Sequence, residues 1–60
     1  MIAANQRALA DGRDAMIAHR LHGAPAPASP FRAGTVRHRY WQWGTERAAR
    51  AIDDLYRIGG

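Results

Sequence analysis

Gly23 to Pro30 read Gly-Ala-Pro-Ala-Pro-Ala-Ser-Pro, and this stretch divides the chain of 60 residues into two parts. Each proline lacks a backbone N–H donor and restricts the residue before it, so a helix does not continue through the stretch. Glycine followed closely by proline is also a typical stop at the end of a preceding helix. We therefore expect a stiff, extended linker over residues 23–34.

Helix-forming residues flank the linker on both sides. From about residue 4 to 22 the chain consists of good helix formers interrupted only by Gly12. Thr35 is a suitable N-cap for a second helix, which we expect over about residues 35–58 because Gly59 follows. The prediction is an all-α protein with one small domain over residues 1–60, a two-helix hairpin joined by a Pro/Ala-rich linker.

One side of the second predicted helix gathers apolar and small residues at the spacing of a buried face. These residues are Tyr40, Trp41, Gly44, Ala48, Ala51, Ile52, Leu55 and Ile58. Small residues also share one side of the first helix, namely Ala8, Gly12 and Ala15. A glycine within a helix costs about 1 kcal/mol relative to alanine. Close packing of the two backbones would explain both helical glycines.

The first helix carries two apolar stripes rather than one. Leu9, Gly12, Ala15 and Met16 form the first stripe, and Ala10, Ile17 and Leu21 lie nearly opposite. One partner helix does not cover both sides. We expect the second stripe either to lie under the linker, with Phe31 folded back on it, or to contact a protein partner, a second copy of the chain included.

Charge is concentrated in the middle of the chain. All nine cationic residues are arginine, the net charge is +4, and residues 29–44 carry +3 of it with four aromatics and no acid. Such a balance favours a nucleic acid or an acidic surface as partner. A GC-rich genome also enriches arginine and alanine, so the total charge alone does not decide the function.

Other compositional features narrow the class of protein. There is no cysteine, so neither disulfides nor a cysteine-based zinc site is expected. The start of the chain does not have the pattern of a signal peptide, and no apolar run approaches the roughly 20 residues of a membrane span. We expect a cytoplasmic protein with no membrane partner.

A tryptophan among arginines is the first candidate binding feature. Trp43 falls away from the apolar side of its helix, flanked at four-residue spacing by Arg39 and Arg47, with Arg50 near the next turn. An exposed indole among cations is typical of single-stranded RNA recognition, in which a base stacks while cations hold phosphates. The alternative is that Trp43 covers Phe31 or the linker, or stacks on arginine for stability.

The basic residues just before Trp43 have no acid nearby in the sequence. Glu46 is placed to pair with Arg50, and Asp53 with Arg57, at i,i+4 spacing. The amides that follow the Thr35 cap, with the helix dipole, also favour an anion between Arg32 and Arg37. The predicted nucleic-acid-binding residues are Arg32, Arg37, His38, Arg39, Trp43 and Arg47.

No set of residues supports catalysis or metal binding. His19 and His22 are three residues apart, but too few further ligands accompany them, and their position near a helix C-terminus suits the helix dipole. No Ser/His/Asp set, phosphate-binding glycine loop or pair of buried carboxylates can be assembled. We expect no enzyme activity, no cofactor and no metal.

Several short motifs occur in an order that resembles the ribosome modulation factor family, including its CrpP-like branch. They are Ala8-x3-Gly12-x2-Ala15, Gly23, Ser-Pro-Phe at positions 29–31, Arg37, Trp41, Gly44, Glu46 and Ala48. The resemblance covers about residues 8–49. It implies a small two-helix protein that binds ribosomal RNA of the small subunit, promotes inactive ribosome dimers and silences translation in slow growth, which is ribosome hibernation.

The chain also departs from that family. It has Ser-Pro-Phe where Cys-Pro-Tyr is common, Trp43-Gly44-Thr45 where Gly-Gly-Trp is common, and no lysine-rich start. The CrpP-like branch implies ATP-dependent modification of a quinolone antibiotic, but no residue of this chain matches a nucleotide site.

Three functions follow, in order of preference. The first is a small basic RNA-binding protein that associates with the ribosome and modulates translation. The second is a protein-interaction module of phage or mobile-element type, docking through Ala10, Ile17 and Leu21. The third is a CrpP-like antibiotic-modifying enzyme.

Overall fold

The computed structural model describes residues 2–59 and the side-chain burial of residues 4–57. It contains two helices, α1 (Ile2–His22) and α2 (Val36–Gly59), which pack against each other, and residues 2–59 form no strand. The predicted all-α two-helix hairpin is confirmed. Ile58, which the sequence assigned to the buried face, lies outside the residues whose side chains are described.

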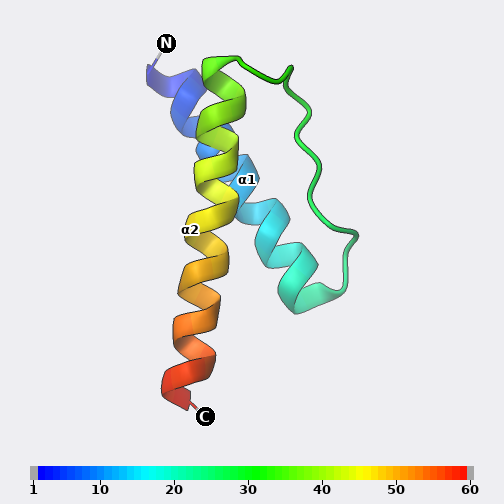
Figure 1. Cartoon of the computed structure of the whole chain (residues 1–60), viewed down its shortest axis with the longest axis vertical. Helices are drawn as coiled ribbons and strands as arrows, with labels where there is room; N and C mark the ends of the chain where they lie inside the picture. Colours follow the sequence, from blue (N-terminus) through cyan, green and yellow to red (C-terminus); the bar gives the residue numbers. More distant parts are fainter. Residues whose placement is uncertain (1, 60) are drawn as a thin grey trace.

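The linker runs back beside α1, so α2 starts next to the N-terminal half of α1 and both helices run in the same general direction (Figure 1). At 1.5 Å per residue, α1 is about 30 Å long. The residues between the helices span up to about 40 Å in an extended conformation of roughly 3.1 Å per residue. The three prolines therefore keep this segment extended enough to return along the whole of α1.

Both ends of the linker are fixed by hydrogen bonds. Gly23 has φ 74°, a left-handed conformation that ends α1 as predicted. Beyond it, the Ala24 amide donates to the Ala18 carbonyl at 3.1 Å, and His19 Nδ1 donates to the Ala24 carbonyl at 2.8 Å. His19 therefore closes the end of α1 through a hydrogen bond, a contact that the sequence did not predict.

Thr35 is the N-cap of α2, as predicted. Its Oγ1 accepts a hydrogen bond from the His38 amide at 3.2 Å, and its carbonyl accepts one from the Arg39 amide at 3.2 Å. The hydroxyl also donates to the Arg32 carbonyl at 2.7 Å. The cap thus holds the end of the linker as well as the start of the helix.

The two backbones touch where the helices cross. A Cβ atom at Gly12 would collide with the Trp41 carbonyl, and one at Gly44 would collide with the Leu9 carbonyl and lie 2.9 Å from the Arg13 amide nitrogen. The predicted close approach at the two glycines is confirmed. The buried residues around the crossing are Ala8, Gly12, Trp41, Gly44, Thr45, Ala48 and Ile52.

The helices diverge beyond the crossing, and this overturns part of the predicted core (Figure 1). Ala51 is exposed, and Leu55 is 71% exposed, although both were assigned to the buried face of α2. Tyr40 and Ala15 are half-buried. The pattern correctly marked the side of α2 that faces α1, but the distance between the helices decides how much of that side is covered.

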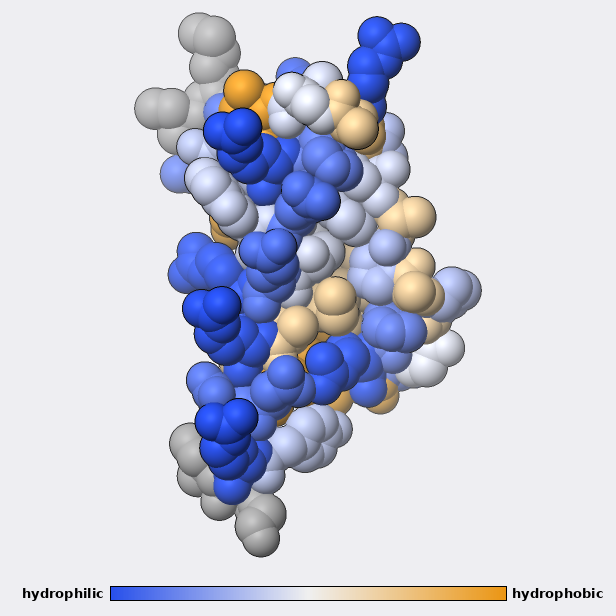
Figure 2. Space-filling model, in the orientation of Figure 1, coloured by the Kyte–Doolittle hydropathy of each residue, from blue (hydrophilic) through white to orange (hydrophobic). Residues whose placement is uncertain are grey.

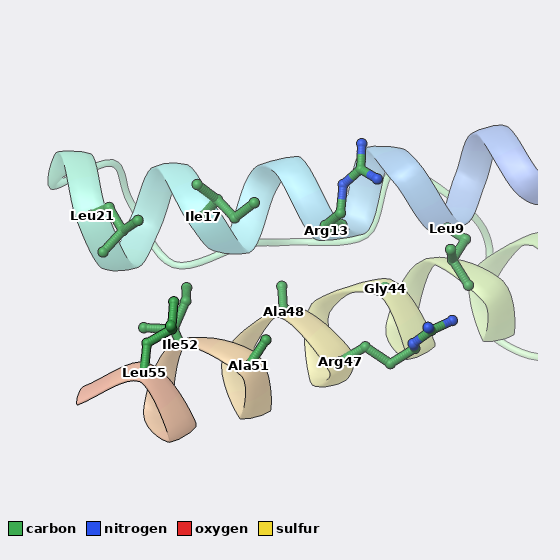
Figure 3. Close-up of a pocket in the computed structure, with 10 residues that line it drawn as sticks. All are labelled: Leu9, Arg13, Ile17, Leu21, Gly44, Arg47, Ala48, Ala51, Ile52 and Leu55. Carbon is green, nitrogen blue, oxygen red and sulfur yellow. The ribbon is translucent and has the colours of Figure 1, made fainter. Parts of the chain in front are cut away.

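The second apolar stripe of α1 was also placed wrongly. Ile17 and Leu21 face α2 across a groove rather than lying on the opposite side (Figure 3). Because rows of residues spaced by four are inclined to a helix axis, the side that meets a crossing partner moves around the helix along its length. Ala10, the third member of that stripe, is half-buried and does not line the groove. Phe31 is half-buried.

Neither of the helices within residues 2–59 combines the length and apolar character needed to cross a bilayer.

Candidate nucleic-acid interface

Three exposed arginines and one exposed tryptophan lie on the side of α2 that is turned away from its buried residues. We call this group the Arg/Trp ridge, and it consists of Arg39, Trp43, Arg47 and Arg50, all exposed. The first three lie at four-residue intervals, so their Cα atoms are about 6 Å apart along the helix. Figure 2 shows strongly hydrophilic side chains along the α2 side of the molecule.

Trp43 is anchored at one edge and open elsewhere. Its ring lies 5.1 Å from that of Tyr40, centroid to centroid, in an edge-on arrangement with an interplanar angle of 73°. Such aromatic pairs are favourable and fix the orientation of both rings. Trp43 nevertheless remains 45% exposed, whereas Trp41 in the crossing is 7% exposed. The two tryptophans therefore have different roles, one in the core and one on the surface.

The ridge arginines have no carboxylate partner within residues 2–59. The ion pairs in this part of the chain are Arg13–Asp14 at 3.1 Å and Arg20–Asp53 at 2.5 Å. Neither the predicted Glu46–Arg50 pair nor the predicted Asp53–Arg57 pair is formed, and Asp53 reaches across to Arg20 of α1 instead. Two long side chains on an exposed helix gain little from pairing, so spacing alone did not determine the partners.

The predicted binding residues do not form one surface. Arg32 and Arg37 are exposed at the end of the linker and the start of α2. On α2, Arg37 lies about 160° around the axis from Arg39. Arg39, Trp43 and Arg47 share the ridge with Arg50, which was noted beside Trp43 but not included in the predicted set.

His38 connects the linker to α2. Its Nδ1 lies 2.8 Å from the Ser29 hydroxyl, which also accepts a hydrogen bond from the Phe31 amide at 3.1 Å. The His38 ring is half-buried as a result. Sequence reasoning placed His38 among the binding residues and missed this contact. The available signal was the serine before a proline, a residue type that often hydrogen-bonds to the backbone two residues on.

In the described part of the chain, no three histidine, aspartate or glutamate side chains gather in a way that would hold a metal ion. His19 already uses Nδ1 to bind the Ala24 carbonyl, and His22 is exposed at the end of α1.

An open apolar groove of about 420 Å³ separates the diverging halves of the helices. Figure 3 shows Ile17 and Leu21 of α1 facing Ile52 and Leu55 of α2 across it. Arg13 and Arg47 lie at the end nearest the crossing, where Arg13 points away from α2. The sequence assigned Ile17 and Leu21 to a separate contact surface and Leu55 to the buried face of the second helix, and it did not predict that they face each other across a groove.

Comparisons with known proteins assign neither a family nor a function to the chain. No protein-family model, curated protein or solved structure matches the chain.

Proposed function

We propose that the Arg/Trp ridge binds single-stranded RNA. The observation that carries the proposal is Trp43, a large aromatic side chain 45% exposed among arginines that have no acidic partner in residues 2–59. Contact between the apolar face of an indole and water is unfavourable. An unpaired base would cover that face by stacking, while the neighbouring phosphates would bind the arginines.

The chemistry of the ridge favours RNA over an acidic protein. Arginine has a planar fork that binds phosphate through two hydrogen bonds and also stacks on bases. Arg39 and Arg47 flank Trp43 by one turn on each side, so phosphates on both sides of a stacked base have a cation within reach. An acidic peptide would use the cations but would leave the indole without a stacking partner.

We further propose that the RNA is ribosomal, in the small subunit, and that binding modulates translation. Support comes from the resemblance of the ordered motifs to ribosome modulation factors. Gly12, Trp41, Gly44 and Ala48 of those motifs build the helix crossing. The resemblance therefore rests on residues that determine the fold, while the surface that would contact RNA is argued from the ridge.

The first experiment is titration of the purified protein with a fluorescently labelled single-stranded oligoribonucleotide at several salt concentrations. Replacing Arg39 and Arg50 by alanine should reduce the slope of log affinity against log salt by up to about 1.4, because each phosphate contact on a single strand contributes about 0.7. Replacing Arg7 and Arg13, two exposed arginines of α1, by alanine is the control for the same change in net charge alone. An unchanged slope in the double variant would refute the phosphate contacts.

The second experiment isolates the stacking contact. Trp43→Ala should weaken RNA binding by about 1–3 kcal/mol, and Trp43→Phe should restore part of the loss. RNA should quench the fluorescence of the natural protein but not that of Trp43→Phe, because Trp41 is buried. Full affinity in Trp43→Ala, with helicity retained, would rule out stacking on Trp43.

The ribosomal part of the proposal has its own test. Lysates of growing and starved cells are separated on sucrose gradients, and the protein is detected in each fraction. Co-migration with small-subunit or dimeric ribosomal particles, lost in the variant lacking Arg39 and Arg50, is the expected result. Absence from every ribosomal fraction in both conditions would contradict ribosome binding without contradicting RNA binding.

A further inference from the structure

The groove between the diverging helices is apolar, open and incompletely covered by the chain itself. Leu21 on one wall is 51% exposed and Leu55 on the other is 71% exposed, while Ile52 at the base is buried. Figure 2 shows apolar surface between more hydrophilic flanks in the lower half of the molecule, where the helices part. Large aliphatic side chains gathered in one concave site are typical of an interface.

The two walls of the groove have the same order of residue types along their length. Each wall is a row of lining residues at four-residue spacing, which begins with an arginine near the crossing and ends with a leucine (Figure 3). The rows are Arg13, Ile17 and Leu21 on α1, and Arg47, Ala51 and Leu55 on α2. The cationic ends coincide because both helices run in the same general direction.

The charge that lines the groove is positive. Arg13 and Arg47 contribute it, and no acidic side chain of residues 2–59 belongs to the lining. Arg47 has no ion-pair partner in this part of the chain, and Arg13 pairs at 3.1 Å with its neighbour Asp14, both side chains being more than half exposed. An exposed pair of this kind is weak, so Arg13 can exchange Asp14 for another carboxylate. The groove therefore has an apolar length and a cationic end.

We propose that the groove binds an amphipathic helix of another protein, which carries acidic residues at one end of its apolar stripe. Charge complementarity favours this occupant, because its acids would bind Arg13 and Arg47 while its apolar stripe covers the aliphatic walls. From Arg13 to Leu21 the α1 wall is about 12 Å long, or about two helical turns. Helices that bind in apolar grooves use anchors at i, i+3, i+4 and i+7, which span a similar length.

Other occupants match the lining less well. A second copy of this chain, docked through the same groove, would bring no carboxylate from its own lining to Arg13 and Arg47. RNA would supply phosphates for these arginines but no apolar surface for the aliphatic walls. A small apolar acid would stay in contact with water, since Leu21 and Leu55 are each more than half exposed and do not enclose it.

Fluorescence anisotropy of a labelled synthetic peptide, titrated with the full chain, tests the proposal. The peptide has about 15 residues, because shorter isolated helices are marginal in water. It carries leucines at i, i+3, i+4 and i+7 and two glutamates at one end of that stripe. A first control peptide has lysines in place of the glutamates, and a second has the same composition without an apolar stripe.

The acidic peptide should bind and gain helicity in circular dichroism. The lysine peptide should bind about tenfold more weakly, because repulsion replaces attraction at both arginines. The peptide without a stripe should not bind. Failure of the acidic peptide to bind, or equal binding of the acidic and lysine peptides, would overturn the proposal.

A substitution in the apolar wall locates the peptide. Leu55→Asp should weaken binding of the acidic peptide at least about tenfold, since it removes an aliphatic contact and places a carboxylate against the apolar stripe. Leu55 is 71% exposed, so this variant keeps the packing of the two helices. Val36→Asp is the matched control, because Val36 is an exposed apolar residue at the other end of α2, and it should bind like the natural protein. Equal binding by Leu55→Asp, with helicity retained, would show that the peptide does not occupy the groove.

A charge reversal tests the cationic end. The double variant Arg13→Glu and Arg47→Glu should prefer the lysine peptide to the acidic one, and added salt should reduce the preference in both proteins. An unchanged preference for the acidic peptide would contradict the predicted contacts. Sedimentation of the protein alone as a concentration-dependent dimer, abolished by Leu55→Asp, would assign the groove to a second copy instead. None of these measurements contains RNA, so they do not depend on binding at the Arg/Trp ridge.

Discussion

Replacing Gly44 by alanine should destabilise the protein, although alanine is the better helix former. On propensity alone the substitution gains about 1 kcal/mol. The added Cβ would meet the Leu9 carbonyl and the Arg13 amide well inside the 3.4 Å at which ordinary contact begins. Both obstacles are backbone atoms, which have no rotamer to change, so α1 and α2 must move apart by about 1 Å.

Separating the helices loosens the packing of the whole crossing, including Ala48 and Trp41. Overpacking typically costs about 1–3 kcal/mol, and the rigid backbone obstacle places Gly44 at the upper end of that range. Subtracting the gain in propensity leaves a net loss of about 2 kcal/mol. For a chain of this length the total stability is about 3–9 kcal/mol. The substitution therefore removes a large share of it.

Urea unfolding followed by far-ultraviolet circular dichroism measures this loss, at one fixed protein concentration because association changes apparent stability. Gly12→Ala should behave in the same way. Gly23→Ala is the comparison, since its Cβ would meet no atom within 4 Å and its cost of about 1 kcal/mol comes from the left-handed backbone alone. A gain of about 1 kcal/mol in Gly44→Ala would show that the backbones are not in contact.

Three further experiments test the remaining local contacts. Thr35→Ala should cost about 1 kcal/mol in urea unfolding because it removes the cap of α2, and no loss would refute the capping bond. A double-mutant cycle of Ser29→Ala and His38→Ala should give a coupling energy of about 0.5–1.5 kcal/mol, whereas simple additivity would show that the two side chains do not interact. A cycle of Arg20→Ala and Asp53→Ala, measured in the monomer, should give only about 0.2–1 kcal/mol, reduced by salt. A larger value insensitive to salt would contradict an exposed pair.

The architecture followed from residues whose effect is local. The prolines of the linker and Gly23 act on their own backbone, so the break between the helices and the cap at Thr35 were predictable. Gly12 and Gly44 were also informative, because a costly residue in a helix needs a packing reason. The helical pattern did not predict the angle at which the two helices cross. Because of that angle, Leu55 is exposed, and Ile17 and Leu21 face α2.

The candidate site was predictable to a similar degree. Exposure of Trp43 between Arg39 and Arg47 followed from the three positions on one helix. The pairing of Asp53 with Arg20 joins residues 33 positions apart in the sequence, and it depends on where the two helices lie relative to each other. Contacts of that kind depend on the tertiary arrangement. The i,i+4 spacing within one helix therefore predicted Arg57 as the partner of Asp53.

Because the linker returns along α1, the two helix dipoles are aligned and the molecule has a net dipole. Because α1 and α2 start at the same end, their dipoles point the same way, and each helix start has the equivalent of about half a positive charge. Neither helix has an acidic residue in its first turn to offset it. An antiparallel pair of helices would largely cancel these fields, whereas here they add. The positive partial charges at the two helix starts therefore add to the charges of Arg32 and Arg37, and they favour an anion that binds directly at that end.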